Sequence, residues 1–290
     1  MMIAGIDGGG THTRLELRDD RNHLIRRESF GPFNLNSIGE PAFRSRLREV
    51  FAACGDISEC GKLCIGGAGV SNPRLGEILE EELKIAGFSG KWKLCGDQEI
   101  ALRGAMEGPG AVVIAGTGSI CFGRNAAGET ARSGGFGHRI DDGGSGYAIG
   151  RDLLSAAVRA ADGRLEDQAI LEAVCRRLGV QTVPELIAFV YAPTTDKSEI
   201  ATLSGIALEL ADDPTAEKIL RREAEELDQL VQAVQKRLHL EGCRVALLGG
   251  LLNDPNPYRQ IVAERLSEIA VPVEPLHDAL WGAAQTAWEL

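Results

Sequence analysis

Two glycine-rich runs are the residues of this 290-residue chain best suited to bind a polyphosphate. Gly8-Gly9-Gly10-Thr11 ends the apolar run at 3–8, and Gly116-Thr117-Gly118-Ser119 follows the apolar run at 111–115. Each forms the tip of a predicted β-hairpin, where successive backbone N–H groups can face one anion and absent Cβ atoms allow close approach. We expect the two tips to face each other across a cleft and to grip one polyphosphate.

Neither run matches the better-known phosphate-binding loops. Neither has the pattern G-x-x-x-x-G-K-[ST], and neither opens directly into a helix as a dinucleotide-binding turn does. One glycine-rich hairpin predicts only a hairpin. Two glycine-rich hairpins, each in the same order of predicted elements, predict a nucleotide site.

Asp7 and Thr11 flank the glycines of the first run. A carboxylate beside a triphosphate can hold Mg²⁺ directly or through water, and the Thr11 hydroxyl can donate to a phosphate oxygen. The alternative for Asp7 is a structural one, because aspartate often caps a tight turn.

Asp97 lies between a predicted strand at 92–95 and a predicted helix at 98–106. Parallel sheets place ligands at this edge, and the position suits a general base that takes a proton from a substrate hydroxyl. A plain helix N-cap explains the same position equally well, so both interpretations stay open.

The elements that must position these residues occur in the order β-β-β-α-β-α-β-α. The expected strands are 3–8, 13–18, 23–30, 62–65 and 92–95, and the expected helices include 75–86, 98–106 and one carrying Phe43, Leu47, Val50 and Phe51 that ends near Gly55. The same order begins again after Pro109, with strands at 111–115, 120–124, 129–132, 245–248 and 271–274 and helices at 258–269 and 280–288. We therefore expect an α/β protein of two similar domains, 1–110 and 111–290.

A helical insert of the second domain is expected at about 155–240. In its last helix Asp213 can cap and Pro214 suits the first helical position. One apolar stripe runs along that helix: Leu220, Ala224, Leu227, Val231, Val234 and Leu238. The stripe can pack inside its own domain or form the seam of a homodimer.

Composition limits the partners and the compartment. The net charge of −11 argues against nucleic acid and anionic membrane, because either requires a basic field. The chain has neither a long apolar run nor a basic, apolar start, so we expect no membrane span, no signal peptide and a cytoplasmic location. The seven scattered cysteines favour buried thiols over a disulfide framework or a zinc site.

A set of motifs in sequential order resembles the N-acetylglucosamine and glucosamine kinases, a branch of the actin, sugar kinase and heat-shock ATPase superfamily. The family also includes the ATPases that activate benzoyl-CoA reductase. The resemblance rests on Gly5-Ile6-Asp7-Gly8-Gly9-Gly10-Thr11, Gly66-Gly67-Ala68-Gly69, Asp97 and its helix, Ala115-Gly116-Thr117-Gly118-Ser119, Gly134-Gly135-Phe136-Gly137-His138, Asp142 with Gly144-Ser145-Gly146, Leu248-Gly249-Gly250, and Asp278-Ala279-Leu280-Trp281-Gly282-Ala283.

The resemblance implies two ribonuclease-H-like lobes with ATP in the cleft between them, and a closing helix at 278–290 that can pack back on the first lobe. It implies that the two glycine runs are phosphate loops, that Gly249-Gly250 contacts adenosine and that Asp97 is the catalytic base. For the sugar it implies contacts from Asn34, with Asn36 as a competitor, and from Asp142. The resemblance also implies that the pocket around the 2-amino or 2-acetamido group is shaped by Gly135, Phe136, Gly137 and His138.

Two departures from the family pattern fall in the sugar pocket. Gly143 stands where the family usually has Glu or Gln, and Phe136 stands where a Trp is frequent. Asp141 is a candidate replacement for the missing polar group. His138 is either a ligand contact or an ordinary loop histidine.

The expected activity is in-line transfer of the γ-phosphoryl group of ATP, with Mg²⁺, to O6 of N-acetylglucosamine or glucosamine. One alternative is an ATPase activator of the benzoyl-CoA reductase type, which bridges an iron–sulfur cluster through cysteines. The cysteines here offer no obvious cluster pair. The other alternative is a non-catalytic sugar sensor, although no segment before the first strand suggests a helix-turn-helix.

Overall fold

The computed structural model describes residues 1–10, 12–67, 69–70 and 72–290, so Thr11 of the first glycine run and Ala68 of the 66–69 run lie outside the described residues. The chain forms two compact units. Unit 1 comprises Met1–Glu107 with Pro275–Leu290, and unit 2 comprises Gly108–Glu274.

Unit 1 is a five-stranded sheet in the order β3-β2-β1-β4-β5. The first three strands pair antiparallel, and β4 and β5 continue parallel to β1. Its strands are β1 (Met2–Gly8), β2 (Thr13–Arg18), β3 (Leu24–Phe30), β4 (Cys60–Gly67) and β5 (Lys91–Gly96), and its helices are α1 (Leu35–Ala53), the 3-10 turn Ile57–Glu59, α2 (Pro73–Ile85), α3 (Asp97–Ala105) and α11 (Ala279–Trp288).

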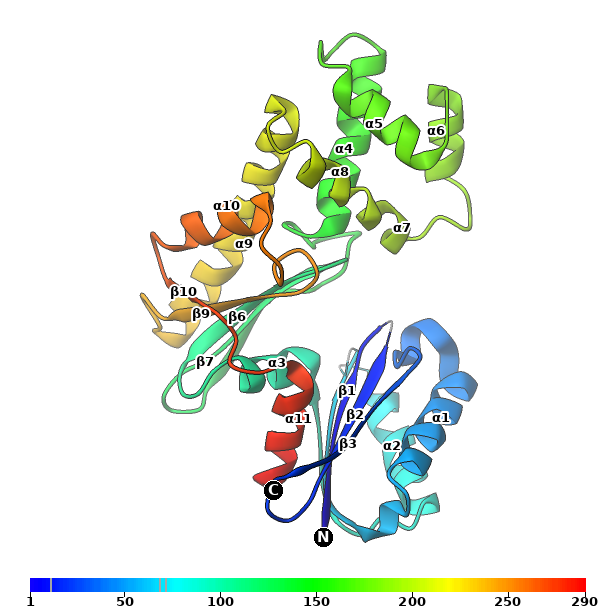
Figure 1. Ribbon diagram of the computed structural model, residues 1–290, viewed down its shortest axis with the longest axis vertical. Coiled ribbons are helices and arrows are strands. Elements are labelled where there is room, and N and C mark those ends of the chain that lie inside the picture. The colour runs from blue at the N-terminus through cyan, green and yellow to red at the C-terminus, as the bar shows by residue number, and fades with distance from the viewer. Residues whose placement is uncertain (11, 68, 71) are drawn as a thin grey trace. The chain divides into compact units, whose positions relative to one another are not determined.

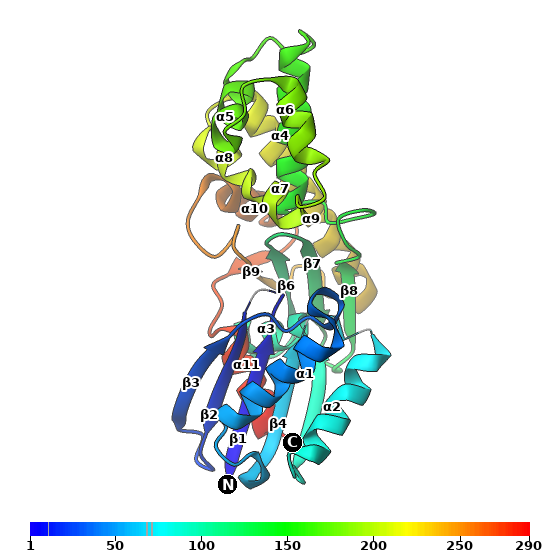
Figure 2. The ribbon, with the colours of Figure 1, turned by 90° about the vertical axis from the view of Figure 1, so that its right-hand side faces the viewer.

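Alternation along β1 divides the core of unit 1 between the two faces of the sheet. Ala4 and Ile6 pack with α1 and α2, whereas Ile3 packs with α3 and α11 (Figures 1 and 2). Successive side chains of a strand point to opposite faces of the sheet. The apolar side chains of β1 therefore contribute to the core on both faces.

Helix α11 comes from the far end of the chain and is fixed on unit 1 by close backbone packing. The N–H groups of Leu276 and His277 donate to the carbonyls of Ala105 and Gly104, at 2.9 and 3.0 Å. A Cβ on Gly5 would collide with the backbone of Ala284. The strand can approach α11 this closely only because residue 5 is glycine.

Unit 2 repeats the sheet of unit 1 in the order β10-β9-β6-β7-β8. Its first three strands again pair antiparallel, and the last two continue parallel. The strands are β6 (Gly110–Ala115), β7 (Ser119–Arg124), β8 (Thr130–Gly134), β9 (Arg244–Leu248) and β10 (Val271–Val273). The expected duplication of one α/β unit is confirmed.

The helices of unit 2 lie between β8 and β9 and after β9. They are α4 (Gly146–Ala161), α5 (Ala169–Leu178), α6 (Val183–Val190), α7 (Lys197–Thr202), α8 (Ser204–Glu209), α9 (Pro214–Leu238) and α10 (Pro257–Leu266). The helical segment starts earlier than residue 155 because the Ser145 side chain caps α4 by accepting from the Ala148 N–H.

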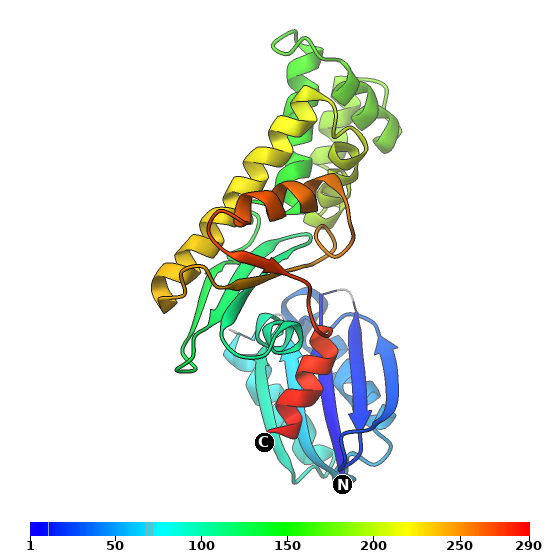
Figure 3. The same ribbon diagram turned by 60° about the vertical axis from the view of Figure 1, so that its left-hand side comes forward.

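Helix α9 begins as the sequence predicts, with Asp213 accepting from the N–H groups of Thr215 and Ala216 and Pro214 in the first turn. Its apolar stripe is buried in the core of unit 2. Figure 3 shows the course of α9, in yellow, beside α10. The stripe therefore packs inside its own unit and is not free to act as a dimer seam.

Five of the seven cysteines are buried and the other two are half-buried, in agreement with the expectation of buried thiols. The sulfurs of Cys64 and Cys95 lie 3.7 Å apart, and the contact with Cys95, together with burial, raises the pKa of the Cys64 thiol. No helix within the described ranges combines the length and apolarity that crossing a membrane requires.

We expect Gly5→Ala to lower the free energy of unfolding of unit 1 by about 1–3 kcal/mol, because the added methyl group forces β1 and α11 apart. All three tryptophans lie in unit 1, so urea unfolding followed by tryptophan fluorescence reports on this unit. Gly76→Ala in α2 is the matched control, since its Cβ points into open space. The control should be neutral or stabilising by about 0.5–1 kcal/mol, and equal effects of the two variants would contradict the packing argument.

Candidate functional site

Three parallel strands of unit 1 end in register at one edge of the sheet. Gly8 of β1 pairs with Gly67 of β4, and Gly67 pairs with Gly96 of β5. The first glycine run therefore begins beside Gly67, and Asp97 follows directly after Gly96. This is the carboxyl edge where parallel sheets bind ligands.

The first glycine turn is closed by its own backbone. The Gly9 N–H donates to the His12 carbonyl at 2.9 Å, and the Gly9 carbonyl accepts from the Phe33 N–H at 3.0 Å. A Cβ on Gly10 would meet no heavy atom within 4 Å of the described residues. Backbone near Gly10 is therefore open to a ligand, whereas the amide of Gly9 is already used.

Asp7 is held by a residue that the sequence analysis missed. Arg14 lies opposite Asp7 in the hairpin register and donates to its Oδ2 through Nη2 at 2.6 Å and Nε at 3.2 Å. Arg14 also pairs with Asp278, the N-cap of α11, at 3.3 Å. The antiparallel register was the signal that could have found Arg14, since a basic residue directly opposite an acidic one can form an ion pair.

Asp97 is the first residue of α3, and it is not the residue that caps the helix. Gly96 takes the N-cap position, and the Glu99 carboxylate accepts its N–H at 3.0 Å. The Asp97 carboxylate accepts from the N–H of its neighbour Gln98, at 2.9 Å. Asp97 therefore does not occupy the N-cap position, but its carboxylate still binds an N–H of the first turn, so the structural and the catalytic interpretation both stay open.

The electrostatic surroundings of Asp97 favour a carboxyl that can accept a proton. Burial raises the pKa of Asp97 above its ordinary value of 3.8, and the negative charge of Asp7 raises it further. The hydrogen bond from Gln98 acts in the opposite direction. Since burial is the largest effect, the net pKa shift is upward.

Asn34 and Asn36 lie together at the start of α1, close to the 66–69 run. Asn34 is the N-cap and its Oδ1 accepts from the Asn36 N–H at 3.0 Å. The Asn36 side chain accepts from Asn72 at 2.9 Å, and a Cβ on Gly69 would lie 3.3 Å from Asn36 Nδ2. Both asparagines therefore remain neighbours of the same loop, and their competition for one role is not decided.

Two of the expected nucleotide segments lie side by side in unit 2. Gly116 closes the second glycine turn by donating to the Gly118 carbonyl at 2.9 Å. The Gly250 amide nitrogen lies 4.0 Å from the place of a Cβ on Gly116, and Gly249, with φ +96°, has no room for a Cβ beside Ala115. The turn at Gly249-Gly250 is thus packed against the turn that begins at Gly116.

Asp142 lies against the second glycine turn. A Cβ on Gly118 would come within 3.0 Å of its Oδ2, and the Ser119 backbone N–H donates to its carboxylate. Asp142 is buried, which raises its pKa. The Ser119 hydroxyl donates to the Gly143 carbonyl at 2.6 Å, so the turn and the loop after β8 support each other.

Phe136 and His138 occupy different surroundings in the loop after β8. Phe136 is 60% exposed, with the Arg132 guanidinium 4.8 Å from its ring centre. Its N–H donates to Asp141 Oδ2 at 3.2 Å. His138 packs edge-on against Tyr147, with ring centres 4.8 Å apart.

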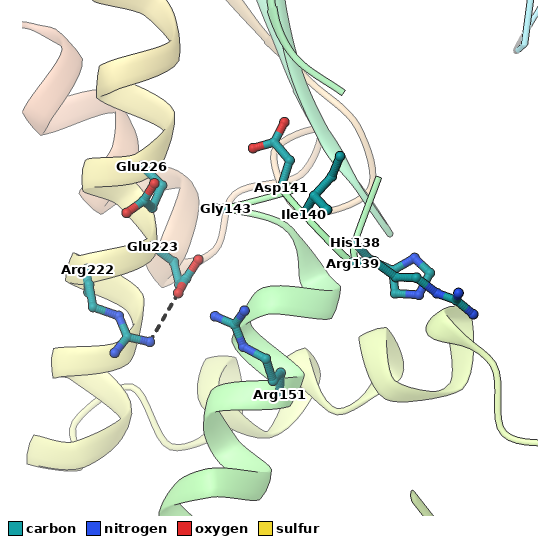
Figure 4. A pocket seen from close by; sticks show the side chains of 9 residues that line it. All are labelled: His138, Arg139, Ile140, Asp141, Gly143, Arg151, Arg222, Glu223 and Glu226. Carbon is teal, nitrogen blue, oxygen red and sulfur yellow. Dashed lines mark hydrogen bonds and ion pairs between the residues drawn. The ribbon is translucent and has the colours of Figure 1, made fainter. Parts of the chain in front are cut away.

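A polar pocket of about 410 Å³ lies beside this loop (Figure 4). Its lining comprises His138, Arg139, Ile140, Asp141, Gly143, Arg151, Arg222, Glu223 and Glu226. Of the residues that the sequence analysis considered for the sugar pocket, His138 and Asp141 line this pocket. Phe136 and Asp142 are not part of its lining.

Helix α9 supplies three pocket residues that sequence reasoning missed: Arg222, Glu223 and Glu226 (Figure 4). The helix was interpreted only through its apolar stripe. Glu226 fills the space beside Gly143, where an added Cβ would lie 2.9 Å from the Glu226 side chain. The carboxyl group next to Gly143 therefore comes from a distant part of the sequence.

Within the described residues, no three His, Cys, Asp or Glu side chains gather as a metal site. Mg²⁺ commonly takes only one or two carboxylates besides water and substrate phosphates, so a single carboxylate beside a phosphate turn fits that ion. Asp7 meets this condition, because Arg14 engages Oδ2 and Oδ1 makes no hydrogen bond to any described residue.

Two units with the same sheet order, each with a glycine turn directly after its first strand, define the duplicated fold of the actin-like ATPases and sugar kinases. The expected fold class is confirmed. The family model described as the BadF/BadG/BcrA/BcrD ATPase family matches residues 4–287. The chain belongs to this family.

Known proteins similar to this chain include kinases of amino sugars. The chain is 35% identical over 264 residues to an N-acetylmuramic acid/N-acetylglucosamine kinase of Clostridium acetobutylicum, covering 88% of this chain and 86% of the relative. It is 29% identical over 258 residues to an N-acetyl-D-glucosamine kinase of Dictyostelium discoideum, covering 83% and 81%.

A solved structure from Chromobacterium violaceum, provisionally assigned as an N-acetylglucosamine kinase, is 27% identical. It superposes with a TM-score of 0.81 over 98% of each chain. These comparisons confirm the expected family and the expected class of enzyme, an ATP-dependent phosphotransferase.

We expect Asp97→Asn to raise the free energy of unfolding of unit 1 at pH 7. A carboxyl whose pKa is raised by folding destabilises the folded protein when it is ionised, so stability falls as pH rises from 3.8 through the raised value. The gain should be full at neutral pH and should disappear toward pH 3.8, where Asp97 is protonated. Urea unfolding followed by tryptophan fluorescence between pH 4 and 8 measures it.

The exposed Asp20, replaced by Asn, is the control for this titration and should show no such gain. A gain for Asp97→Asn that is the same at every pH would contradict the effect of charge burial.

Proposed function

We propose that the protein is an ATP-dependent kinase of an amino sugar, N-acetylglucosamine or glucosamine, and that it phosphorylates the 6-hydroxyl group. Membership of an ATPase family supports the use of ATP. The activities of the Clostridium and Dictyostelium relatives support an amino sugar as the acceptor.

The proposal rests mainly on the position of Asp97 and on the raised pKa of its carboxyl group. This carboxylate lies at the carboxyl edge of the sheet of unit 1, next to the first glycine turn, and is half-buried, which raises its pKa. Glu99 binds the N–H at the N-cap position of the same helix. A half-buried carboxyl with a raised pKa at this edge has the properties of a general base.

In the proposed reaction Asp97 accepts a hydrogen bond from the acceptor hydroxyl and orients its oxygen toward the γ-phosphorus of ATP. As the new O–P bond forms, the bond between the γ-phosphorus and the β,γ-bridging oxygen breaks and ADP leaves. The hydroxyl proton passes to an Asp97 carboxylate oxygen. The products are the sugar phosphate, ADP and a protonated Asp97 that later returns its proton to water.

Phosphate binding is assigned to backbone groups near Gly8, Gly9, Gly10 and Thr11 in unit 1 and to Gly116, Thr117, Gly118 and Ser119 in unit 2. Glycine at these turns lets an anion approach the peptide groups closely. Gly249 and Gly250 would contact adenosine, consistent with their packing beside Gly116. Asp7 would hold Mg²⁺, directly or through water, and the ion would neutralise charge on the phosphates.

Sugar contacts are proposed for Asn34, Asp142 and the loop with Gly135, Phe136 and His138. The absence of a side chain at Gly143 is offset in space by Glu226. The exposed ring of Phe136 offers an apolar face of the kind that can cover a sugar ring.

A screen of ADP release with ATP, Mg²⁺ and glucosamine, N-acetylglucosamine, N-acetylmannosamine or glucose tests the acceptor. We expect one of the first two sugars to stimulate ADP release most. ³¹P–¹H NMR of the product should place the phosphate on O6. ADP release that no sugar stimulates would contradict the kinase and would favour an ATPase activator, and sugar binding without ATP consumption would favour a sensor.

Asp97→Asn should lower kcat by roughly 10²–10⁴, with little change in ATP affinity, because the amide cannot accept the proton. Steady-state kinetics with the best acceptor and direct calorimetric titration of ATP measure both quantities. Asp20→Asn is again the control. Near-normal turnover of the Asp97 variant would remove this residue as the base.

A further inference from the structure

Both backbone groups of Gly144, in the loop after β8, are bound by buried side chains that the proposed reaction does not use. Glu223 of α9 accepts the Gly144 N–H through Oε2 at 2.7 Å, and the Tyr258 hydroxyl of α10 donates to the Gly144 carbonyl at 2.8 Å. Glu223 is 2% exposed and Tyr258 is fully buried. The side chains of Glu223 and Tyr258 and the backbone of Gly144 are called the Gly144 clamp below.

The backbone that the Gly144 clamp holds is in an unfavourable conformation. Asp142 has φ +70°, which is rare for a residue with a side chain, and Gly144 has φ +83°. Glycine adopts such a φ without steric cost, but a residue with a side chain, such as Asp142, keeps it only where surrounding structure fixes it. A Cβ on Gly144 would collide with Leu227, so α9 packs directly on this peptide.

The same loop is joined to the second glycine turn. The Ser119 hydroxyl donates to the Gly143 carbonyl at 2.6 Å, and the Gly146 N–H donates to the Gly116 carbonyl at 2.8 Å. The Asp142 carboxylate lies against Gly118. Residues 142–146 are therefore fixed from one side by α9 and α10 and from the other by the turn.

We propose that Glu223 and Tyr258 are positioning residues that hold Asp142 in place for the acceptor sugar. The part of this inference that concerns the sugar rests on the proposed function. The glycine turn is also closed by its own hydrogen bond between Gly116 and Gly118. Loss of the Gly144 clamp should therefore affect the acceptor far more than ATP.

The charge on Glu223 is compatible with this role. Burial raises the pKa of Glu223, while the hydrogen bond from Gly144 and the nearby guanidinium groups of Arg222 and Arg151 act against that shift. Arg222 lies 3.2 Å from the second carboxylate oxygen (Figure 4). The carboxylate thus has partners for both oxygens.

Three variants test the Gly144 clamp. Glu223→Leu removes the acceptor for the Gly144 N–H, and Tyr258→Phe removes the donor to its carbonyl. Glu223→Gln keeps an acceptor oxygen in nearly the same place. The controls are Glu225→Gln on the exposed face of α9 and Tyr191→Phe, which is 81% exposed.

With the full chain and the best acceptor from the ADP-release screen, Glu223→Leu and Tyr258→Phe should raise the acceptor KM at least about 10-fold, since small displacements of binding groups are costly. The ATP KM should change less than about 2-fold, and Glu223→Gln should restore most of the acceptor affinity. Equal changes in both KM values, with no rescue by Gln, would overturn the positioning role.

Hydrogen exchange of the peptide that contains residues 142–146 provides a readout without catalysis. Exchange at Gly144 should be at least about 10-fold faster in Glu223→Leu than in Glu223→Gln or in the controls, because the buried bond is lost. Unchanged exchange would overturn the Gly144 clamp itself. If the wild-type protein phosphorylates no sugar but exchange responds as expected, the proposed function fails and the structural part of the inference stands.

Discussion

The structure depends first on the register of three parallel strand ends in unit 1. Gly8, Gly67 and Gly96 pair in one row, so the strands stop together and leave an edge almost free of side chains. Asp7 and Asp97 flank this row, which places two carboxylates beside a turn that lacks Cβ atoms. A slip of one residue in any of these strands would turn its side chains to the opposite face of the sheet and separate the carboxylates from the turn.

Unit 2 has the same sheet topology but carries a large helical insertion. Its sheet again ends the first strand in a glycine turn, but the chain then leaves the repeat and forms α4 to α9 before β9 completes the sheet. These helices bring Arg151, Glu223 and Glu226 to the loop after β8. The last helix, α11, belongs to unit 1, where Asp278 pairs with Arg14 and Arg14 with Asp7. Residues at both ends of the chain thus hold the candidate magnesium ligand.

Side chains distant in sequence pack against the loop after β8 in unit 2 and bind its backbone. Gly143 has no side chain, and Glu226 occupies the adjacent space. Asp142 has a positive φ, and Glu223 and Tyr258 bind the backbone of Gly144, two residues further on. Strain of this kind marks functional sites because the surrounding structure must offset its cost. Two helices, α9 and α10, thus fix the conformation of this irregular loop. Neither helix contains a residue of the glycine motifs.

The sequence by itself determined the elements, the duplication and the glycine turns, because hydrophobic periodicity, helix caps and glycine preferences act over a few residues. Asp213, for example, caps α9 as its spacing predicts. The motifs also indicated the family, which the matched family model confirms. The pair of Asp7 and Arg14 follows from the register of one hairpin, and the contact of Glu99 with Gly96 spans three residues, so local patterns could have indicated both. The contacts of Glu223 and Tyr258 with Gly144 come from the tertiary structure. They could not be predicted, because the packing of helices distant in sequence sets them and local sequence patterns do not describe that packing.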